Sequence, residues 1–140
     1  MANPVCPETG APMVRGSRPM TLTYKGQSVT FDMPGWYVDG SDEGIHNGED
    51  MKVSDRELNR LKARVDGLLL PEAIKRVRRK LQLTQREAGT LIGGGPNAFQ
   101  KYEKGDLLAS RAASNLLLVL DKHPGALEVI KHNKEDSQAA

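Results

Sequence analysis

LTQREAGTLIGGGPNAFQKYEKG, residues 83–105, is the stretch that decides the fold of this chain. It reads as a helix, a tight turn at the consecutive glycines 93–95, and a second helix from Pro96 to Lys104. On a wheel of about 100° per residue the second helix has two unlike faces. One face carries Asn97, Gln100, Lys101 and Lys104, and the other carries Ala98, Phe99 and Tyr102. This pattern predicts a helix-turn-helix whose second helix presents amide and ammonium groups to a partner, with the aromatic residues in the core.

Further helices are predicted on both sides of this segment. Pro71 suits the first turn of a helix, and Thr84 with Glu87 forms a capping box that opens the first helix of the motif. Apolar residues recur at helical spacing over residues 110–121, and Pro124 permits a last helix over about 125–132. We expect five helices around a small core in residues 68–132, followed by a disordered tail, residues 133–140.

The first half of the chain is predicted to contain strands. Residues 1–19 are rich in proline, glycine and small side chains, so we expect irregular structure there. Residues 20–33 alternate apolar and polar side chains around Lys25-Gly26, a pattern typical of two strands joined by a tight turn. Pro34-Gly35 should end this pattern, and residues 36–38 could begin a third strand.

One helix is predicted to close this first half. The polar, glycine-rich segment 39–50 should be a loop, and Ser54 with Glu57 has the form of a capping box that opens a helix over about 54–66. The fold class is therefore α+β, with a small strand-and-helix domain in residues 1–67 and the all-α domain in residues 68–132. A continuous helical connection between the two domains is an alternative to a flexible boundary.

Bulk properties exclude several classes of protein. No run approaches the roughly 18 apolar residues of a membrane span, and the N-terminus lacks the charged and apolar regions of a signal peptide. We therefore expect a cytoplasmic protein that does not contact membrane. The single cysteine, Cys6, excludes an internal disulfide framework. We find no nucleophile–base pair, phosphate loop or paired carboxylates, and we interpret the acidic stretch 39–50 as a solvated loop rather than a metal or acid–base site, so an enzyme is not expected.

The net charge of +2 hides an asymmetry between the two halves. Residues 1–66 hold 8 Lys and Arg against 10 Asp and Glu, whereas residues 67–140 hold 12 against 8. Within residues 71–104 the count is 8 basic to 3 acidic side chains. Such a run is often only a solvated helix face. Its coincidence with the helix-turn-helix favours a polyanionic partner for the second half.

Two sequence blocks resemble known families. "LTQREAG", the glycine turn and "YEKG" resemble the XRE (Cro/cI-like) helix-turn-helix, and "GGGPNAFQKYEKG" with "LLLVLDKHP" resemble the C-terminal domain of the MqsA (YgiT-type) antitoxins, over about residues 70–130. The resemblance implies a homodimeric repressor that binds a palindromic operator in double-stranded DNA. It also implies an N-terminal domain that neutralises a protein toxin, expected to cleave RNA. Alternatives are a regulator of the same family without a toxin, or an interaction module that no longer reads DNA.

The resemblance also assigns roles to single residues. It implies base contacts for Asn97 and Lys101, beside Gln100, although an arginine is expected where Lys101 stands. Lysine lacks the two-pronged donor geometry of arginine, so base reading there should be weaker or different. By analogy with XRE-like domains, Arg78 and Glu103 should form a structural ion pair. Phosphate contacts, whose alternatives are helix capping or plain solvent exposure, are expected for Thr84, Gln85, Arg86, Lys104, Arg79 and Lys80.

Four apolar residues indicate a dimer interface: Leu107, Leu108, Leu118 and Val119. They follow the second helix of the motif or lie beside the apolar stripe of residues 110–121. The alternative is that they belong to the internal core. We expect the interface, because one small monomer cannot easily cover all of them, and because paired helix-turn-helix units bind half-sites about 34–36 Å apart.

The N-terminal half departs from the family pattern. A structural zinc ion needs four sulfur or imidazole ligands. The first pair would fall on Cys6 and Thr9 and the second on Val38 and Ser41, so Cys6 is the one ligand of the four that is present. His46 does not complete the set. We therefore predict that the domain keeps a strand–strand–helix outline with no metal and no other cofactor. Its core should rest on apolar and aromatic side chains, namely Leu22, Tyr24, Val29, Phe31, Trp36 and Tyr37.

Overall fold

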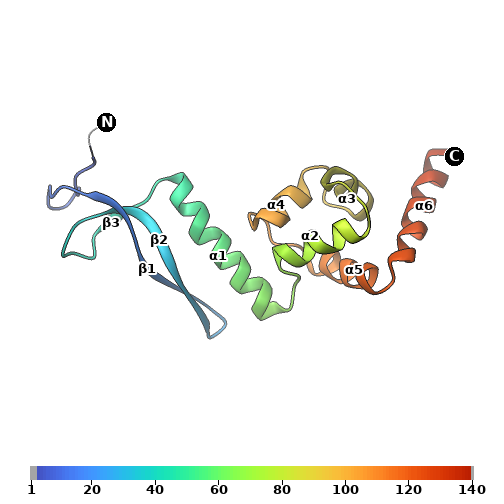
Figure 1. The fold of residues 1–140 in the computed structure, drawn as a ribbon, viewed down its shortest axis with the longest axis horizontal. Coiled ribbons are helices and arrows are strands. Elements are labelled where there is room, and N and C mark those ends of the chain that lie inside the picture. Colours follow the sequence, from blue (N-terminus) through green and yellow to red (C-terminus); the bar gives the residue numbers. More distant parts are fainter. Residues whose placement is uncertain (1–2, 140) are drawn as a thin grey trace. The chain divides into compact units, whose positions relative to one another are not determined.

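The computed structural model describes residues 3–139. The chain forms two compact units that divide between Leu61 and Lys62. The first contains a three-stranded antiparallel sheet, and the second consists of helices (Figure 1). The predicted α+β class is therefore confirmed. None of the helices in the described part of the chain is both long enough and apolar enough to cross a bilayer.

The sheet is built on one long hairpin. Strand β1 (Val14–Tyr24) pairs with β2 (Gln27–Tyr37) along its whole length, and β2 pairs at its end with the short β3 (Gly44–Ile45). The connecting residues Lys25 and Gly26 have φ angles of 49° and 79°. Two left-handed residues make the kind of turn whose twist matches that of a hairpin, as the sequence predicted.

The hairpin is longer than predicted at both ends. Residues 14–19, expected to be irregular, belong to β1, and Pro34-Gly35 does not end β2. The strand register explains why β2 continues through the proline. Hydrogen-bonded and non-hydrogen-bonded pairs alternate along an antiparallel hairpin, starting here from the hydrogen-bonded pair Tyr24–Gln27 beside the turn. Pro34, opposite Ser17, therefore falls in a non-hydrogen-bonded pair. The missing N–H of Pro34 therefore faces away from β1, where proline is tolerated. Its carbonyl faces the same way and accepts a hydrogen bond from His46 Nδ1 at 2.8 Å.

The predicted third strand is also wrong. Trp36 and Tyr37 end β2, and the partner strand β3 comes from the segment 39–50 that we expected to be a loop. The six side chains predicted to form the core of this half are only half-buried. The fully buried apolar side chains of the first unit are instead Cys6, Met13, Met33 and Leu61, because a narrow hairpin cannot enclose its own aromatic residues.

Helix α1 (Gly48–Asp66) begins six residues earlier than predicted. Ser54 is buried inside the helix, and its hydroxyl donates to the Met51 carbonyl at 3.0 Å, so the predicted cap is wrong. The real cap is reciprocal. Asn47 N–H donates to Asp50 Oδ2 at 3.0 Å, and Asp50 N–H donates to Asn47 Oδ1 at 2.8 Å. Two overlapping cap signals stand in the sequence, and only the earlier one is used.

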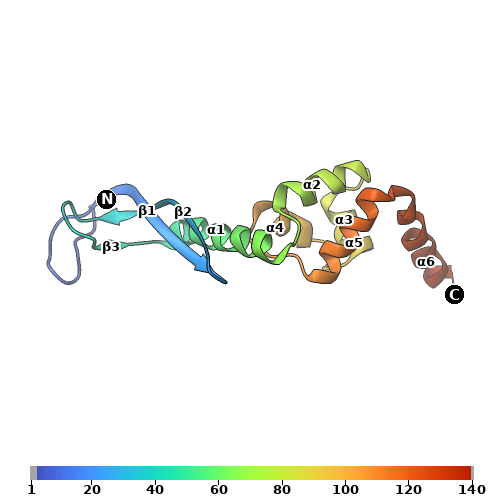
Figure 2. The same ribbon diagram turned by 90° about the horizontal axis from the view of Figure 1, so that it is seen from below.

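The second unit packs its helices around one core (Figures 1 and 2). They are α2 (Pro71–Lys80), α3 (Gln85–Ile92), α4 (Ala98–Lys104), α5 (Arg111–Lys122), the 3-10 turn η1 (Pro124–Ala126) and α6 (Leu127–Ala139). The fully buried centre consists of Val77, Ala88, Phe99, Leu117 and Leu120. Residues 133–139, expected to be a disordered tail, continue α6, because this stretch contains neither proline nor glycine and His132 lies 3.9 Å from Glu135 at i,i+3 spacing.

Candidate nucleic-acid interface

The glycine turn between α3 and α4 places the second helix of the motif. Gly93, Gly94 and Gly95 have φ angles of 125°, 96° and 95°, which L-residues rarely adopt. The turn also requires a glycine at position 89 on α3, which the sequence pattern did not indicate. A Cβ atom there would lie 1.8 Å from the Gly95 carbonyl oxygen, so the turn rests directly on the helix backbone.

Helix α4 divides into two faces as its sequence predicts. Ala98, Phe99 and Tyr102 are buried, and the Phe99 and Tyr102 rings meet edge to face at 5.3 Å between centroids. The exposed side chains are Asn97, Gln100, Lys101 and Lys104. Asn97 precedes the helix as its N-cap residue, yet its side chain makes no capping hydrogen bond. The amide therefore projects from the start of α4 together with the exposed face.

A buried ion pair fastens α4 to α2. Arg78 Nε donates to Glu103 Oε2 at 2.7 Å, and Nη2 donates to Oε1 at 2.9 Å. The remaining Nη1 donates to the Leu83 carbonyl at 2.9 Å. Hydrogen bonding to Glu103 raises the pKa of Arg78. With side-chain exposures of 11% and 5%, this pair is screened from water and fixes the orientation of α4.

The start of α3 is internally satisfied. Thr84 N–H donates to Glu87 Oε1 at 2.9 Å, and Thr84 Oγ1 accepts from Glu87 N–H at 3.1 Å, which confirms the predicted capping box. Hydrogen bonds from the Thr84 backbone and side chain lower the pKa of Glu87. Gln85, expected to meet phosphate, directs its amide to Glu103 at 3.3 Å. These groups therefore build the scaffold of the motif, and Glu87 already places negative charge at this helix N-terminus.

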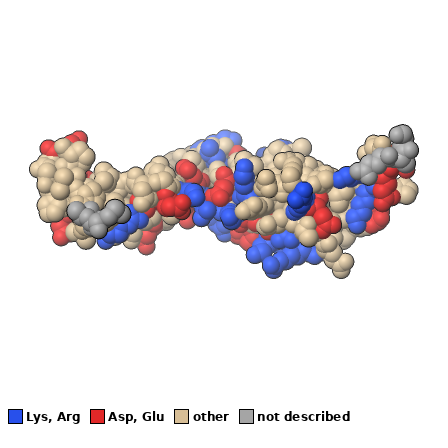
Figure 3. All heavy atoms as spheres, turned by 90° about the horizontal axis from the view of Figure 1, so that it is seen from above, with Lys and Arg blue, Asp and Glu red and all other residues tan. Residues whose placement is uncertain are grey.

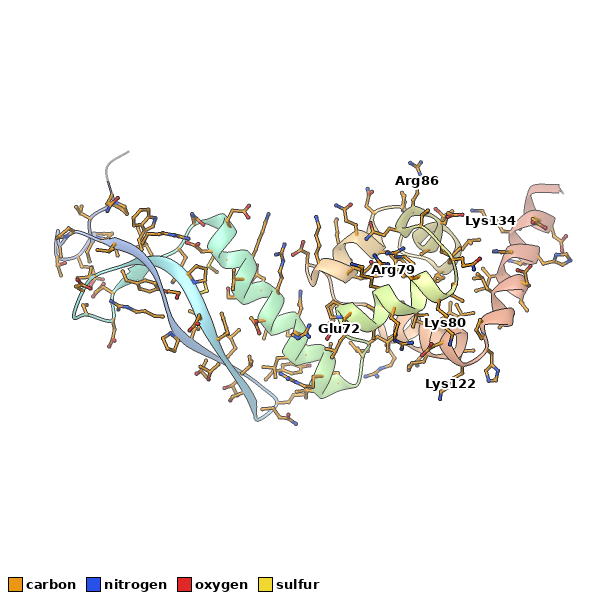
Figure 4. All side chains as sticks on the ribbon, in the orientation of Figure 1. Glu72, Arg79, Lys80, Arg86, Lys122 and Lys134 are labelled. Atoms are coloured by element: carbon orange, nitrogen blue, oxygen red, sulfur yellow. The ribbon has the colours of Figure 1, made fainter. Side chains whose placement is uncertain are left out.

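The basic side chains expected to meet phosphate do not share one environment. Lys80 Nζ donates to the Asp121 carbonyl at 2.6 Å and lies 3.2 Å from Asp121 Oδ1. Arg76, which sequence reasoning missed, binds both oxygens of the same carboxylate at 3.1 Å. Arg86 instead projects outward from α3, and Arg79 lies on α2 (Figure 4). Arg76 and Asp121 stand 45 residues apart, so no local pattern marks their contact.

The surface of the second unit is basic and partly apolar. Lysine and arginine side chains gather along this helical part of the chain, with acidic side chains between them (Figure 3). Of the residues expected at a dimer interface, Leu107, Leu118 and Val119 are 44%, 43% and 50% exposed, whereas Leu108 is half-buried. Apolar side chains that are exposed together in one patch are typical of surfaces that meet a partner, whereas single exposed ones are normal.

Comparison with known proteins gives a family match over both units. The family described as the antitoxin component of a bacterial toxin-antitoxin system, MqsA, matches residues 1–131. Antitoxin MqsA of Escherichia coli (strain K12) is 38% identical over 133 residues, which cover 94% of this chain and 100% of that relative. The similarity therefore includes the strand-containing half as well as the helix-turn-helix.

Proposed function

This chain belongs to the MqsA family of antitoxins, and from that premise we propose that it is a cytoplasmic DNA-binding repressor of its own operon that also neutralises a protein toxin. Membership of the family makes it the antitoxin component of a toxin–antitoxin system. It points to a regulator rather than an enzyme, and it implies a toxin as partner.

The exposed face of α4 carries the DNA-binding proposal. An amide, a glutamine and two lysines project from a helix whose opposite side is fully packed, and major-groove recognition uses such side chains on the second helix of this motif. In this arrangement the Asn97 amide makes two hydrogen bonds to an adenine. Lys101 and Gln100 reach neighbouring base edges, while Lys104, Arg79 and Arg86 contact phosphates.

Recognition of a palindrome requires two copies of the chain. We propose that the exposed Leu107, Leu118 and Val119, with Leu108 beside them, form the dimer interface. A twofold dimer presents two α4 helices to half-sites about one DNA turn apart. Dimerisation therefore doubles the number of base contacts without any new recognition residue.

The toxin proposal rests on the family match in the first unit. The match begins at residue 1 and runs through the hairpin and α1, so this unit shares its sequence pattern with antitoxins and not only with DNA-binding proteins. We propose that it binds the toxin, and that the toxin cleaves RNA. Base reading and toxin binding are then divided between the two units.

DNA binding is tested by fluorescence anisotropy with the chain's own promoter and a scrambled duplex. Asn97→Ala and Lys101→Ala should each weaken operator binding by about 1–3 kcal/mol and reduce discrimination between the two duplexes. Lys122→Ala, an exposed lysine on α5 that points away from Arg86 (Figure 4), is the matched control. Unchanged binding by both α4 variants would show that another surface meets DNA.

Toxin neutralisation is tested with the reading frame that neighbours this gene. Its product should arrest growth when expressed alone, and co-expression of the full chain should restore growth and yield a complex on affinity purification. Operator binding without such a product would indicate a regulator that has no toxin. Loss of both activities would indicate an interaction module.

A further inference from the structure

Helix α6 extends beyond the part of the chain that resembles the family. The family match ends at residue 131, whereas α6 continues to Ala139. Lys134 lies in this extension and is half-buried beside α3. Any site that uses Lys134 is therefore a property of this chain rather than of the matched family region.

Lys134 lines a groove between α6 and α3. The groove has a volume of about 340 Å³, and its other lining residues are Arg86, Glu87, Thr90 and Leu91. Figure 4 shows Arg86 and Lys134 on the same side of this unit. The carboxylate of Glu87 is engaged by the backbone N–H of Thr84. The recess is therefore lined by two positive charges and one negative charge, beside the Thr90 hydroxyl, so its net charge is positive.

We propose that this groove binds a backbone phosphate of DNA outside the base pairs read by α4, a proposal that rests on the function proposed above. In helix-turn-helix complexes the first helix of the motif crosses the DNA backbone next to the groove that holds the second. Arg86 lies in the first turn of that helix. Lys134 adds a second cation from α6, so the proposed contact surface extends beyond the two helices of the motif.

The test is the salt dependence of binding by the full chain. The variants are Lys134→Gln and Arg86→Gln, with Lys122→Gln as the matched control, and the duplexes are the operator and a scrambled sequence. Because the two cations share one phosphate, the double variant Arg86→Gln/Lys134→Gln should reduce the slope of log affinity against log salt by about 0.9, the value for one lost phosphate contact, and each single variant should reduce it by less. Each should weaken both duplexes by the same factor, because phosphate contacts carry no sequence information.

The possible outcomes distinguish a failure of the groove proposal from a failure of the DNA-binding proposal on which it rests. If Lys134→Gln binds like Lys122→Gln while Asn97→Ala weakens operator binding, the groove proposal is wrong and the DNA-binding proposal stands. If Lys134→Gln weakens only the operator, the groove does not meet phosphate and the proposal is also wrong. If the unmodified chain binds neither duplex, both proposals are wrong.

The first unit carries an independent observation about metal. The family resemblance implies four zinc ligands, but Val38 and Ser41 occupy the second ligand pair. Within residues 3–139, His, Cys, Asp and Glu side chains nowhere gather in a group of three or more that could hold a metal ion. The buried Cys6 directs its Sγ to Glu43 Oε2 at 3.7 Å. The donor set therefore does not fit a structural zinc ion.

An arginine lies where that ligand pair would be. The guanidinium of Arg18 on β1 donates from Nη2 to the Val38 carbonyl at 2.6 Å and from Nη1 to the Ser41 carbonyl. Its carbon Cζ lies 4.6 Å from the centroid of the Tyr37 ring. The planar, always charged guanidinium suits this double contact, because it presents two parallel N–H donors and a flat face for the ring.

We infer that Arg18 performs the cross-linking that a zinc ion performs in a four-ligand site, so that the first unit folds without metal. Arg18 joins the loop after β2 to β1, and the Cys6–Glu43 hydrogen bond joins the same loop to the N-terminal segment. Both links use side chains already present. Neither depends on the proposed DNA or toxin binding.

Trp36, the one tryptophan, reports on this unit alone. Thermal unfolding of the full chain, followed by Trp36 fluorescence, should have the same midpoint with a chelator, with equimolar zinc, and with neither. Arg18→Gln should lower the midpoint by about 4–8 °C, the shift that a loss of about 1 kcal/mol causes in a domain of this size. Arg18→Lys should lower it less, and Lys52→Gln, which changes an exposed residue of the same unit, is the matched control.

Three results would overturn this inference. They are a lower midpoint with chelator, one bound zinc per chain in the purified protein, or equal midpoints for Arg18→Lys, Arg18→Gln and Lys52→Gln. If Arg18→Gln does not fold, Arg18→Lys and the chelator series still decide the question. A metal-held unit must lose stability with chelator whatever residue stands at position 18.

Discussion

Arg78 of α2 and Glu103 of α4 are joined side by side, with N–O distances of 2.7 and 2.9 Å. Because both side chains are nearly inaccessible to water, neither partner can be removed without leaving a buried charge. The pair ties α2 to α4 through Glu103, the residue that follows the buried Tyr102. The pair therefore links the stability of the second unit to the orientation of the exposed face of α4.

Glu103→Ala should lower the free energy of unfolding of the second unit by about 3–5 kcal/mol, because the Arg78 charge stays buried without its partner. Urea unfolding followed by far-UV circular dichroism measures this. The control is Arg76→Gln, which breaks the exposed pair with Asp121 and should cost less than about 1 kcal/mol. Equal effects of the two variants would contradict the structural role assigned to Glu103.

Gly89→Ala should destabilise the second unit by about 1–3 kcal/mol or more, because the added Cβ meets the Gly95 carbonyl and must displace the turn. Operator affinity should fall with it, since the turn positions α4. Gly125→Ala is the control, because a Cβ there meets no atom within 4 Å. A stable Gly89→Ala variant with unchanged affinity would show that the turn can move without consequence.

The stability of the first unit should decrease in acid. Hydrogen bonds from Arg15 are the main cause that lowers the pKa of Asp50 to about 2 from 3.8. The unfolded chain therefore takes up this proton first as pH falls, so the stabilisation is complete above about pH 4 and is lost between pH 4 and pH 2. Trp36 fluorescence in urea at several pH values measures it. Asp50→Asn should flatten this dependence, whereas Asp121→Asn, in the other unit, should leave it unchanged.

Lys101→Arg should change which operator is preferred. The planar guanidinium of arginine can donate two parallel hydrogen bonds to guanine, whereas the ammonium group of lysine is a flexible point charge without this fixed geometry. We expect discrimination for guanine at the contacted base pair to rise by about 1–3 kcal/mol. Competition among operator variants measures this change. An unaltered preference among the operator variants would indicate that residue 101 contacts phosphates rather than bases.

Leu118→Glu should abolish the proposed dimer and leave a monomer, because it puts an unpaired charge into the apolar interface. Light scattering at micromolar concentration measures the mass. Operator binding should weaken while binding to a single half-site stays the same. A monomeric unmodified chain would remove the basis for this interface.

Much of the second unit could be predicted from sequence because its signals are local. A capping box, three glycines and the 3.6-residue period act within one or two turns, and α3, the turn and the two faces of α4 follow from them. The structure of the first unit is less predictable from sequence, because contacts between distant segments determine it. Whether Asn47 or Ser54 starts α1 depends on Arg15, 35 residues from Asp50 in the sequence, which holds the Asp50 carboxylate of the earlier cap.

By itself, the sequence determined the α+β class, the helix-turn-helix and the four exposed side chains of its second helix, since these depend on periodicity and short-range capping. Only the tertiary structure decided which cations remain available and how the first unit is held together. In the folded chain Lys80 contacts Asp121, and Lys134 and Arg86 line the same groove. The guanidinium of Arg18 donates hydrogen bonds to the carbonyls of Val38 and Ser41. The physical reason is that ion pairs and backbone contacts between distant segments depend on packing geometry, which no local pattern of residues encodes.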